Sequence, residues 1–214
     1  MVKCLIFDCD GTLVDSELLC NVGLAMKLAE KGIEADPTVL MHQYRGWKLA
    51  KIMHALEKLY EIQLEPDFEP TYRKIVSSLF ETELKPMAGV EAMLKQIDLP
   101  MCVASSGPRH KIEQALWVTG LSRFFGRNIF SSYEVQSWKP EPGLFLHAAG
   151  QMGFAPDVCA VVEDSEVGIE AAVAAGMRPI LYEPGGVSCD GVSCDEGPVW
   201  SVGAMADLGK LVGF

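Results

Sequence analysis

Residues 2–17 read Val-Lys-Cys-Leu-Ile-Phe-Asp-Cys-Asp-Gly-Thr-Leu-Val-Asp-Ser-Glu. A short apolar run that ends in acidic residues and glycine is typical of a buried strand that opens into a loop. Because strand side chains alternate in direction, we expect Asp8 and Asp10 to point the same way. Two carboxylates that share one small space repel each other unless a cation, a shared proton or strong donors compensate. The segment therefore predicts a metal-assisted active site.

Two other interpretations of this segment remain open. Asp is common in turns at strand exits, where it bonds to its own backbone. A calcium loop of the EF-hand type is the second, but that pattern needs glycine at the sixth position of the loop, and Gly11 is the fourth residue counted from Asp8.

The composition indicates a folded globular protein with an acidic surface. Hydrophobic residues make up 49% of the 214 residues, and the net charge is −11 at pH 7. Such a chain is a poor partner for nucleic acid or an anionic membrane, and any phosphate must be held by local cations. Few apolar residues precede Asp8, and no apolar stretch is long enough to span a bilayer. We expect a cytoplasmic protein with no nucleic-acid, membrane or obligate protein partner.

The cysteines and histidines carry no recognisable ligand pattern. The seven cysteines show no paired or zinc-type spacing, which favours a reducing compartment. Cys189 and Cys194 repeat as Val-Ser-Cys-Asp in a Gly-rich stretch, which we interpret as an exposed insertion rather than a metal or redox element. Packing or surface roles are expected for His42, His54, His110 and His147.

Helical periodicity dominates the residues after the first acidic loop. Apolar residues recur at helical spacing over 18–31, 47–60 and 68–84. No convincing strand pattern interrupts this stretch. We therefore expect a separate helical unit over residues 16–85, inserted into a second unit made of residues 1–15 and 86–214.

After residue 86, short apolar strands alternate with helices. Alternation of this kind predicts βαβ units and a parallel sheet, to which residues 3–7 add a first strand. The expected fold class is α/β, a Rossmann-like parallel sheet core with an inserted α-helical domain. The expected strands are 100–104, 128–131, 158–162 and 178–182, and the expected helices are 89–97, 109–118, 142–152 and 166–175.

Polar residues follow three more of these strands. Ser105 and Ser106 come where a helix would begin, so they form either an anion site or an ordinary helix cap. Lys139 lies next to Pro140 and near Pro142, which stiffen the chain and can aim its ammonium at a fixed point. A lone lysine is, however, more often solvated surface.

The fourth strand ends in Glu163 and Asp164, which either cap the following helix or join the first two acids. In the second case, Asp8 and Asp10 complete an all-oxygen cluster without His or Cys. Hard oxygen ligands suit Mg²⁺ far better than zinc. Ligands of parallel sheets bind at the carboxyl ends of the strands, where these residues are expected.

These residues resemble the motifs of a known family. Asp8-Cys9-Asp10-Gly11-Thr12, Ser105, Lys139 and Glu163-Asp164 are similar, in order, to the four motifs of the haloacid dehalogenase (HAD) superfamily of phosphohydrolases. The resemblance covers essentially the whole chain. The helical insertion directly after the first motif is similar to the cap of the β-phosphoglucomutase-like branch.

The resemblance implies a role for each motif residue. Asp8 would be the nucleophile that forms an aspartyl-phosphate. Asp10 would protonate the leaving alcohol, then accept a proton from water, and its backbone carbonyl would reach the metal. Lys139 and Ser105 would neutralise the transferring phosphoryl group. The Mg²⁺ ligands would be Asp8, Asp10 and Asp164, with Glu163 as a direct or indirect partner.

The resemblance also implies the substrate class, a small phosphorylated metabolite such as a sugar phosphate or a sugar acid phosphate like 6-phosphogluconate. Arg45, Gly46 and Lys48, in a turn between two expected helices, would contact the substrate with Ser105, Ser106 and Lys139. Two solvated charges on a helical insert are the alternative reading of Arg45 and Lys48.

Two other functions are weighed against the phosphatase. A sugar phosphomutase would share the aspartyl-phosphate, but phosphatases of this branch commonly show Gly-Thr-Leu-Val-Asp-Ser, as residues 11–16 do, and mutases usually replace the Thr. A non-catalytic phosphate-binding or phospho-acceptor module is the other alternative, but receiver domains, which also use clustered acids, Mg²⁺ and a Lys around an Asp, lack the inserted helical domain and the second catalytic Asp.

Overall fold

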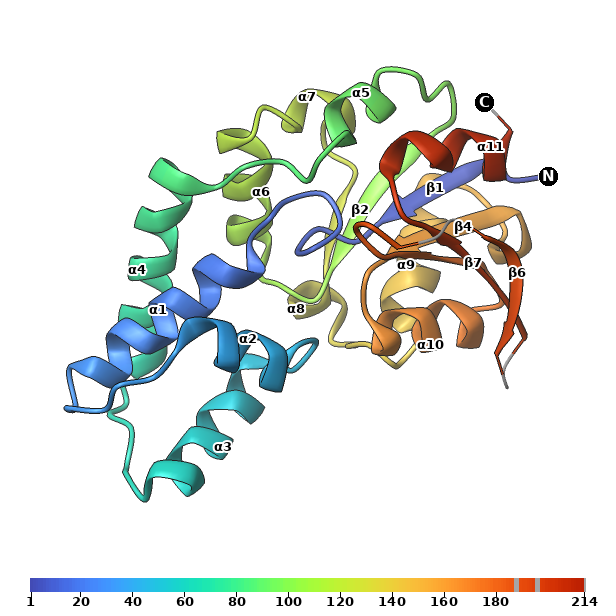
Figure 1. Ribbon diagram of the computed structural model, residues 1–214. Coiled ribbons are helices and arrows are strands. Elements are labelled where there is room, and N and C mark those ends of the chain that lie inside the picture. The colour runs from blue at the N-terminus through green and yellow to red at the C-terminus, as the bar shows by residue number, and fades with distance from the viewer. Residues whose placement is uncertain (187–188, 195–196, 214) are drawn as a thin grey trace. The chain divides into compact units, whose positions relative to one another are not determined.

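The computed structural model describes residues 1–186, 189–194 and 197–213, and the side chains of 1–186 and 199–213. It divides into two compact units, which we call the core unit (Met1–Val14 and Lys85–Phe214) and the helical unit (Asp15–Leu84). Figure 1 shows the elements of both.

The core unit is built on a seven-stranded sheet with the order β3-β2-β1-β4-β5-β7-β6. Neighbouring strands are parallel as far as β7, and β6 pairs antiparallel with β7. This confirms the expected α/β fold class with a Rossmann-like sheet. The strands are β1 (Cys4–Phe7), β2 (Met101–Ser105), β3 (Ile129–Ser131), β4 (Cys159–Glu163), β5 (Arg178–Tyr182), β6 (Cys189–Cys194) and β7 (Gly197–Val202).

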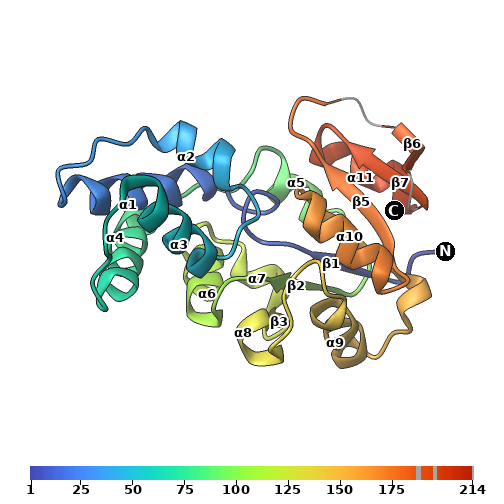
Figure 2. The same ribbon diagram turned by 90° about the horizontal axis from the view of Figure 1, so that it is seen from below.

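Helices cover both faces of this sheet (Figures 1 and 2). On one face, Ile6 packs in a core cluster with Phe145 and Ala171, which come from α9 and α10. On the other face, the ring of Phe7 meets that of Phe125 in α7, with centroids 6.1 Å apart. The core helices are α5 (Val90–Leu94), α6 (Arg109–Val118), α7 (Ser122–Phe125), α8 (Ser132–Val135), α9 (Gly143–Met152), α10 (Glu166–Ala174) and α11 (Leu208–Val212), with 3₁₀ turns at Pro156–Val158 and Met205–Asp207.

The continuous apolar run of β1 explains this two-sided burial. Ile6 and Phe7 are neighbours that point to opposite faces, and both are fully buried. A strand buried on both faces reads as a continuous apolar run, as residues 4–7 do. This run fits the position of β1 in the interior of the sheet, between β2 and β4.

The helical unit consists of α1 (Glu17–Ala29), α2 (Pro37–Tyr44), α3 (Leu49–Tyr60) and α4 (Phe68–Glu83). Helices α1 and α4 approach closely at Gly23, where an added Cβ would lie 2.8 Å from Cγ2 of Val76. Helix α2 was not expected from periodicity. It begins where Asp36 accepts a 2.7 Å hydrogen bond from the Thr38 amide, and Pro37 occupies its first position.

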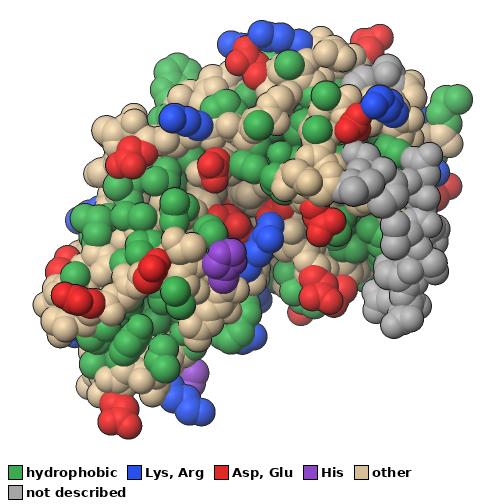
Figure 3. Space-filling model, viewed as in Figure 1, with side chains coloured by type: hydrophobic (Ala, Val, Ile, Leu, Met, Phe, Trp, Pro, Cys, Tyr) green, Lys and Arg blue, Asp and Glu red, His purple; other side chains and the backbone are tan. Residues whose placement is uncertain are grey.

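The surface fits the acidic composition. On the face drawn in Figure 3, acidic and basic side chains are interspersed, with no continuous basic patch. Within the described ranges, no helix has both the length and the apolar character needed to cross a membrane.

The cysteines fall into two groups. Cys4, Cys9, Cys20, Cys102 and Cys159 are free thiols. Cys189 and Cys194 are the end residues of β6, and their side chains lie outside the described residues, so the interpretation of this repeat stays a prediction.

Candidate active site

The candidate site lies at the carboxyl ends of three neighbouring interior strands of the sheet, β2, β1 and β4. Asp8 follows the last residue of β1, Ser105 ends β2 and Glu163 ends β4. Phe7 is in register with Val103 of β2 and Val162 of β4, so the three polar residues emerge at the same edge. At β1 the connections diverge to the two sides of the sheet, which is where ligands bind in open α/β sheets.

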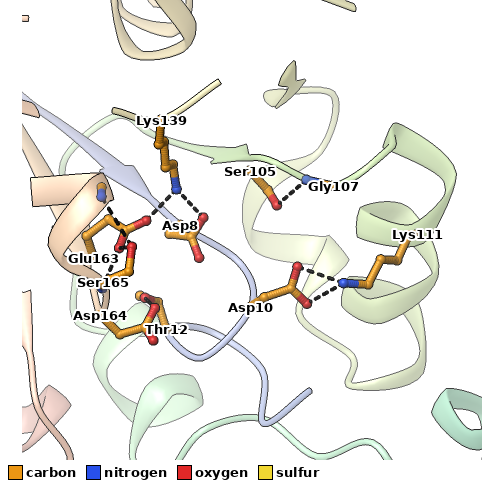
Figure 4. A network of polar contacts seen from close by, with 11 residues as sticks. Asp8, Asp10, Thr12, Ser105, Gly107, Lys111, Lys139, Glu163, Asp164 and Ser165 are labelled. Carbon is orange, nitrogen blue, oxygen red and sulfur yellow. Dashed lines mark hydrogen bonds and ion pairs between the residues drawn. The ribbon is translucent and has the colours of Figure 1, made fainter. Parts of the chain in front are cut away.

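Lys139 holds two of these acids together. Its ammonium forms ion pairs with Asp8 Oδ1 and Glu163 Oε1 (Figure 4). Asp8 is 5% exposed, Glu163 is 1% exposed, and the lysine side chain is 4% exposed. The residue lies between α8 and α9, where its side chain also passes the ring of Phe145 at 5.1 Å. A lysine this deeply buried is not the solvated surface residue that was its alternative interpretation.

Burial and neighbouring charges shift the pKa values of Asp8 and Lys139. Burial raises the pKa of Asp8 well above its ordinary range; Lys139 opposes the shift, and repulsion from Glu163 and Asp164 adds to it. Burial alone would lower the pKa of Lys139, but attraction from Asp8 and Glu163 outweighs it and raises that pKa. One ammonium therefore does not balance the negative charge of the buried acids.

Asp8, Glu163 and Asp164 form a group that fits a divalent cation. Each offers a carboxylate oxygen, and these oxygens lie within 4.8 Å of one another. All three residues are buried, which keeps their charges from being screened by water. A donor set of carboxylate oxygens alone suits Mg²⁺, a hard cation with oxygen ligands. The residues present therefore fit the metal that the sequence predicts.

Hydrogen bonds from neighbouring residues hold two of these carboxylates in place. The amide and the hydroxyl of Ser165 each donate to Glu163 Oε2 at 2.7 Å, and Ser165 also caps α10 by accepting from the Gly168 amide. Thr12 Oγ1 donates to Asp164 Oδ1 at 3.0 Å.

Gly11 is required where the first loop passes this cluster. Its φ is +81°, a conformation that favours glycine. A Cβ at this position would also collide with the carboxylate of Asp164. The Gly in the first motif therefore lets the backbone run directly against the acid of the fourth motif.

The side chain of Asp10 does not follow the strand alternation from which it was expected to point the same way as Asp8. Strand β1 ends at Phe7, so strand alternation does not govern residues 8–10. The carboxylate of Asp10 is bound by Lys111 of α6, with Nζ 2.8 Å from Oδ1 and 2.9 Å from Oδ2 (Figure 4). The side chain of Asp10 is not part of the three-carboxylate group. Its expected place as a metal ligand through the backbone carbonyl stays a prediction.

The loop after β2 is braced by its own hydrogen bonds. Ser105 is buried, and its hydroxyl accepts from the amide of Gly107 at 3.1 Å. Ser131, at the end of β3, donates to the Gly107 carbonyl at 2.6 Å. The residue at the N-cap of α6 is Pro108, so neither Ser105 nor the half-buried Ser106 caps the helix.

The other expected substrate contacts belong to the helical unit. Arg45, Gly46 and Lys48 lie between α2 and α3. A turn between two helices was expected here, but α2 was not, and the expected helix over 47–60 had included Lys48. Gly46 has a φ of +75°. The Arg45 side chain is half-exposed, and its Nε lies 3.5 Å from Glu17 Oε1. Their assignment as substrate contacts stays a prediction.

Three residues of the site were not singled out from the sequence. Lys111 pairs with Asp10, Ser165 with Glu163, and Ser131 with the loop after β2. Only Lys111 carries a signal in the sequence, because it is one of three basic residues in a row at the start of a helix.

The comparisons with known proteins agree with this geometry. Residues 2–176 match the family of haloacid dehalogenase-like hydrolases. The 6-phosphogluconate phosphatase of Escherichia coli K12 is 36% identical over 182 residues, which are 85% of this chain and 82% of that protein. Fructose-1-phosphate phosphatase YqaB of the same organism is 29% identical, over 82% of this chain and 94% of that protein.

Solved structures agree as well. A haloacid dehalogenase-like protein of Agrobacterium tumefaciens C58 superimposes with a TM-score of 0.81 at 29% identity, over 99% of this chain and 98% of the other. The family match extends over most of the chain and includes all four motifs described above. The chain belongs to the haloacid dehalogenase-like hydrolases and is a phosphatase of that family.

Proposed function

We propose that the protein is a Mg²⁺-dependent phosphomonoester hydrolase that works through an aspartyl-phosphate on Asp8. The observation that carries this proposal is the position of Asp8. Its carboxylate is buried at the end of β1 and bound by Lys139, and it has an oxygen within 4.8 Å of carboxylate oxygens of two further acids. A carboxylate in this setting can attack an electrophile whose negative charge the surrounding cations neutralise.

In the first proposed step, a carboxylate oxygen of Asp8 attacks the phosphorus of the substrate. A new O–P bond forms, the bond from phosphorus to the leaving oxygen breaks, and Asp10 gives that oxygen a proton. In the second step, Asp10 takes a proton from water as the water attacks the same phosphorus. Inorganic phosphate leaves, and the Asp8 carboxylate is regenerated.

Lys139 and Ser105 stabilise the charge that builds up on the transferring group. The Lys139 ammonium stays protonated beside its two acids, and the Ser105 hydroxyl emerges from the neighbouring strand. Mg²⁺ bound by Asp8, Asp164 and Glu163 would supply further neutralisation of the phosphoryl oxygens.

We propose a sugar phosphate or a sugar acid phosphate such as 6-phosphogluconate as the substrate. The similarity to a 6-phosphogluconate phosphatase over most of both chains supports the sugar acid. The similarity to a fructose-1-phosphate phosphatase supports the wider sugar class. Changes in the inserted helical unit can alter the substrate while the core chemistry is kept.

A phosphate-release screen tests this function. Sugar phosphates, phosphorylated sugar acids, phosphoglycolate and nucleotides are incubated with the protein in Mg²⁺, and both inorganic phosphate and isomeric sugar phosphates are measured. We expect phosphate release from sugar or sugar acid phosphates. Formation of an isomeric sugar phosphate without phosphate release would show a mutase instead.

The phosphoenzyme is tested separately by mass spectrometry of acid-quenched reactions. We expect the mass of one phosphoryl group on the peptide that contains Asp8, and none in Asp8→Asn. Turnover at the wild-type rate in Asp8→Asn would overturn the mechanism.

A further inference from the structure

The first turn of α6 carries three basic residues, Arg109, His110 and Lys111, and no acid. The N-terminus of a helix has a positive partial charge, so basic residues are disfavoured there. Arg109 binds Glu134 and the carbonyl of Ile129 outside the helix and pairs with Glu113 within it. Lys111 forms its ion pair with Asp10 instead. The first turn of α6 therefore carries a positive charge that is unfavourable at a helix N-terminus. This charge, on Lys111, lies next to Asp10, the proposed acid and base.

The geometry of the Asp10–Lys111 pair fixes the carboxylate of Asp10. One ammonium contacts both oxygens, at 2.8 and 2.9 Å, so rotation of the carboxylate loses both contacts (Figure 4). The two residues are far apart in sequence and come from different elements. Helix α6 is anchored in the core by Ile112 and Leu116, which are buried.

The pair lies beside another residue of the site. A Cβ placed on Gly107 would lie 3.5 Å from Ser105 Oγ, 3.6 Å from Lys111 Cδ and 3.8 Å from Asp10 Oδ2. The hydroxyl of Ser105, the stem of Lys111 and the carboxylate of Asp10 therefore surround the same glycine. Lys111 meets Asp10 within the site.

The exposure of the pair argues against a purely structural purpose. The side chain of Lys111 is 21% exposed and that of Asp10 is 28% exposed. Ion pairs that remain in contact with water contribute little to folding stability. What the pair does provide is a fixed direction for one carboxylate, and proton transfer depends steeply on such geometry.

We propose that Lys111 is a positioning residue that holds the Asp10 carboxylate where it exchanges a proton with the leaving oxygen. The inference rests on the proposed function, since it needs Asp10 to be the proton carrier. Lys111 itself touches neither the phosphoryl group nor the metal in this role.

Substrates that differ in their need for a proton test this role. p-Nitrophenolate leaves without protonation, whereas phenolate and sugar alkoxides are poor leaving groups that need it. Phenyl phosphate differs from p-nitrophenyl phosphate only by the para nitro group, and neither has an ionised group besides its phosphate. Values of kcat/KM report events up to the first irreversible step, so they isolate the attack of Asp8 from later hydrolysis.

The variants are Lys111→Met, which keeps the stem without the charge, and Lys111→Arg. We expect Lys111→Met to lower kcat/KM on the order of ten- to a hundredfold for phenyl phosphate and for the best sugar phosphate, a part of what general acid catalysis contributes. The value for p-nitrophenyl phosphate should stay nearly unchanged. Recovery in Lys111→Arg supports the role, because a guanidinium can also bind a carboxylate through two contacts.

Arg109→Met is the control from the same turn of α6, since it removes a charge and the ion pairs with Glu134 and Glu113 without touching Asp10. We expect it to lower the melting temperature at least as much as Lys111→Met does. The ratio of the kcat/KM values for the two aryl phosphates should stay unchanged.

Three outcomes would overturn the inference. One is an equal loss for both aryl phosphates in Lys111→Met, which would mean that Lys111 serves the phosphoryl group or the fold. Another is a loss of kcat/KM confined to sugar phosphates, which would mean that Lys111 binds the sugar part of the substrate. The third is the same leaving-group effect in Arg109→Met. The proposed function is tested independently, by phosphate release from the wild type and by the loss of activity in Asp8→Asn.

Discussion

The side chain of Glu163 occupies the space that a side chain at Gly168 would need. A Cβ on Gly168 would overlap the carboxylate carbon and both oxygens of Glu163. Glu163 folds back over the first turn of α10, where Ser165 donates two hydrogen bonds to it. The glutamate at this position therefore depends on a glycine inside the following helix.

Gly168→Ala is predicted to weaken both the fold and metal binding. At an ordinary helix position alanine is more favourable than glycine by about 1 kcal/mol. Here the added methyl group displaces Glu163, so we expect lower stability and weaker Mg²⁺ binding. Glu163→Asp shortens the acid and should make room, so the effects of the two changes should not add. Thermal denaturation and Mg²⁺ titration of the four proteins in the double-mutant cycle measure this coupling, and additive effects would contradict it.

Asp8→Asn and Asp10→Asn are each predicted to abolish phosphate release. The first change removes the proposed nucleophile and the second the proposed proton carrier. Both proteins should fold. Because burial raises the pKa of Asp8, its ionised form is unfavourable in the metal-free fold, and a neutral amide removes that cost. Phosphate release and thermal melting in EDTA measure the two effects. Asp98→Asn, at an exposed loop position, is the control with the same loss of charge and should retain full activity.

Lys139→Met is predicted to destabilise the metal-free protein strongly. It leaves Asp8 and Glu163 as buried carboxylates without their shared ammonium. Breaking a buried ion pair from one side typically costs about 3–5 kcal/mol. Urea denaturation in EDTA measures this loss, and saturating Mg²⁺ should restore part of it. Lys95→Met breaks an exposed pair with Glu91 and should change stability by no more than about 0.5 kcal/mol. A similar small change in Lys139→Met would contradict the prediction.

Turnover is predicted to require Mg²⁺ and to stop in EDTA. Ca²⁺ should inhibit, because it takes more ligands at longer distances and loosens the geometry of in-line attack. Asp164→Asn should lose the rise in melting temperature that Mg²⁺ gives the wild type, which measures binding without activity. Full activity after exhaustive chelation would show that the three carboxylates serve another purpose.

Arg45→Ala, and less strongly Lys48→Ala, are predicted to raise KM for the best natural substrate. The prediction assumes that residues of the helical unit contact the variable leaving group and that residues of the core unit bind the phosphoryl group common to all substrates. An anionic leaving group would be bound best by arginine, because its planar guanidinium group can form two parallel hydrogen bonds to one carboxylate. Loss of such a contact costs about 1.5–3 kcal/mol, or on the order of ten- to a hundredfold in kcat/KM.

Hydrolysis of p-nitrophenyl phosphate should be nearly unchanged in both variants. Arg73→Ala, which breaks an ion pair with Glu69 within the same unit, is the control. If Arg45→Ala lowers kcat/KM equally for both substrates, Arg45 supports the fold of its unit, and the proposal of a sugar acid phosphate as substrate loses support.

Much of the fold follows from hydrophobic periodicity. The expected helix over 109–118 and strand over 178–182 coincide with α6 and β5, and the other expected core elements differ only at their ends. These segments combine a clear apolar pattern with glycine or proline at their boundaries. Helix α2 was missed because its apolar residues are few, although Asp36 and Pro37 are a start signal. Strands β6 and β7 were missed because glycine and proline weaken their pattern.

The site was predictable where it depends on strand ends. Asp8, Ser105 and Glu163 follow apolar runs, and parallel pairing alone brings such ends to one edge. Their catalytic roles stay predictions. The partner of Asp10 was beyond the sequence, because β1 ends before it and the loop conformation decides where its side chain points. The contacts of Ser165 and Lys111 likewise depend on helices whose placement only the fold provides.

The backbone around Val14 has a consequence for how this protein can change. Val14 forms an antiparallel bridge with Pro86, and the Met87 amide donates to the Leu13 carbonyl at 2.9 Å. The points where the chain leaves the core unit and returns to it are thus tied together within that unit. Closing a chain segment between two fixed, adjacent points costs entropy that grows only slowly with its length. The segment between them is therefore an exchangeable module: another sequence of different length can be grafted at this junction while the acids at the strand ends stay in register.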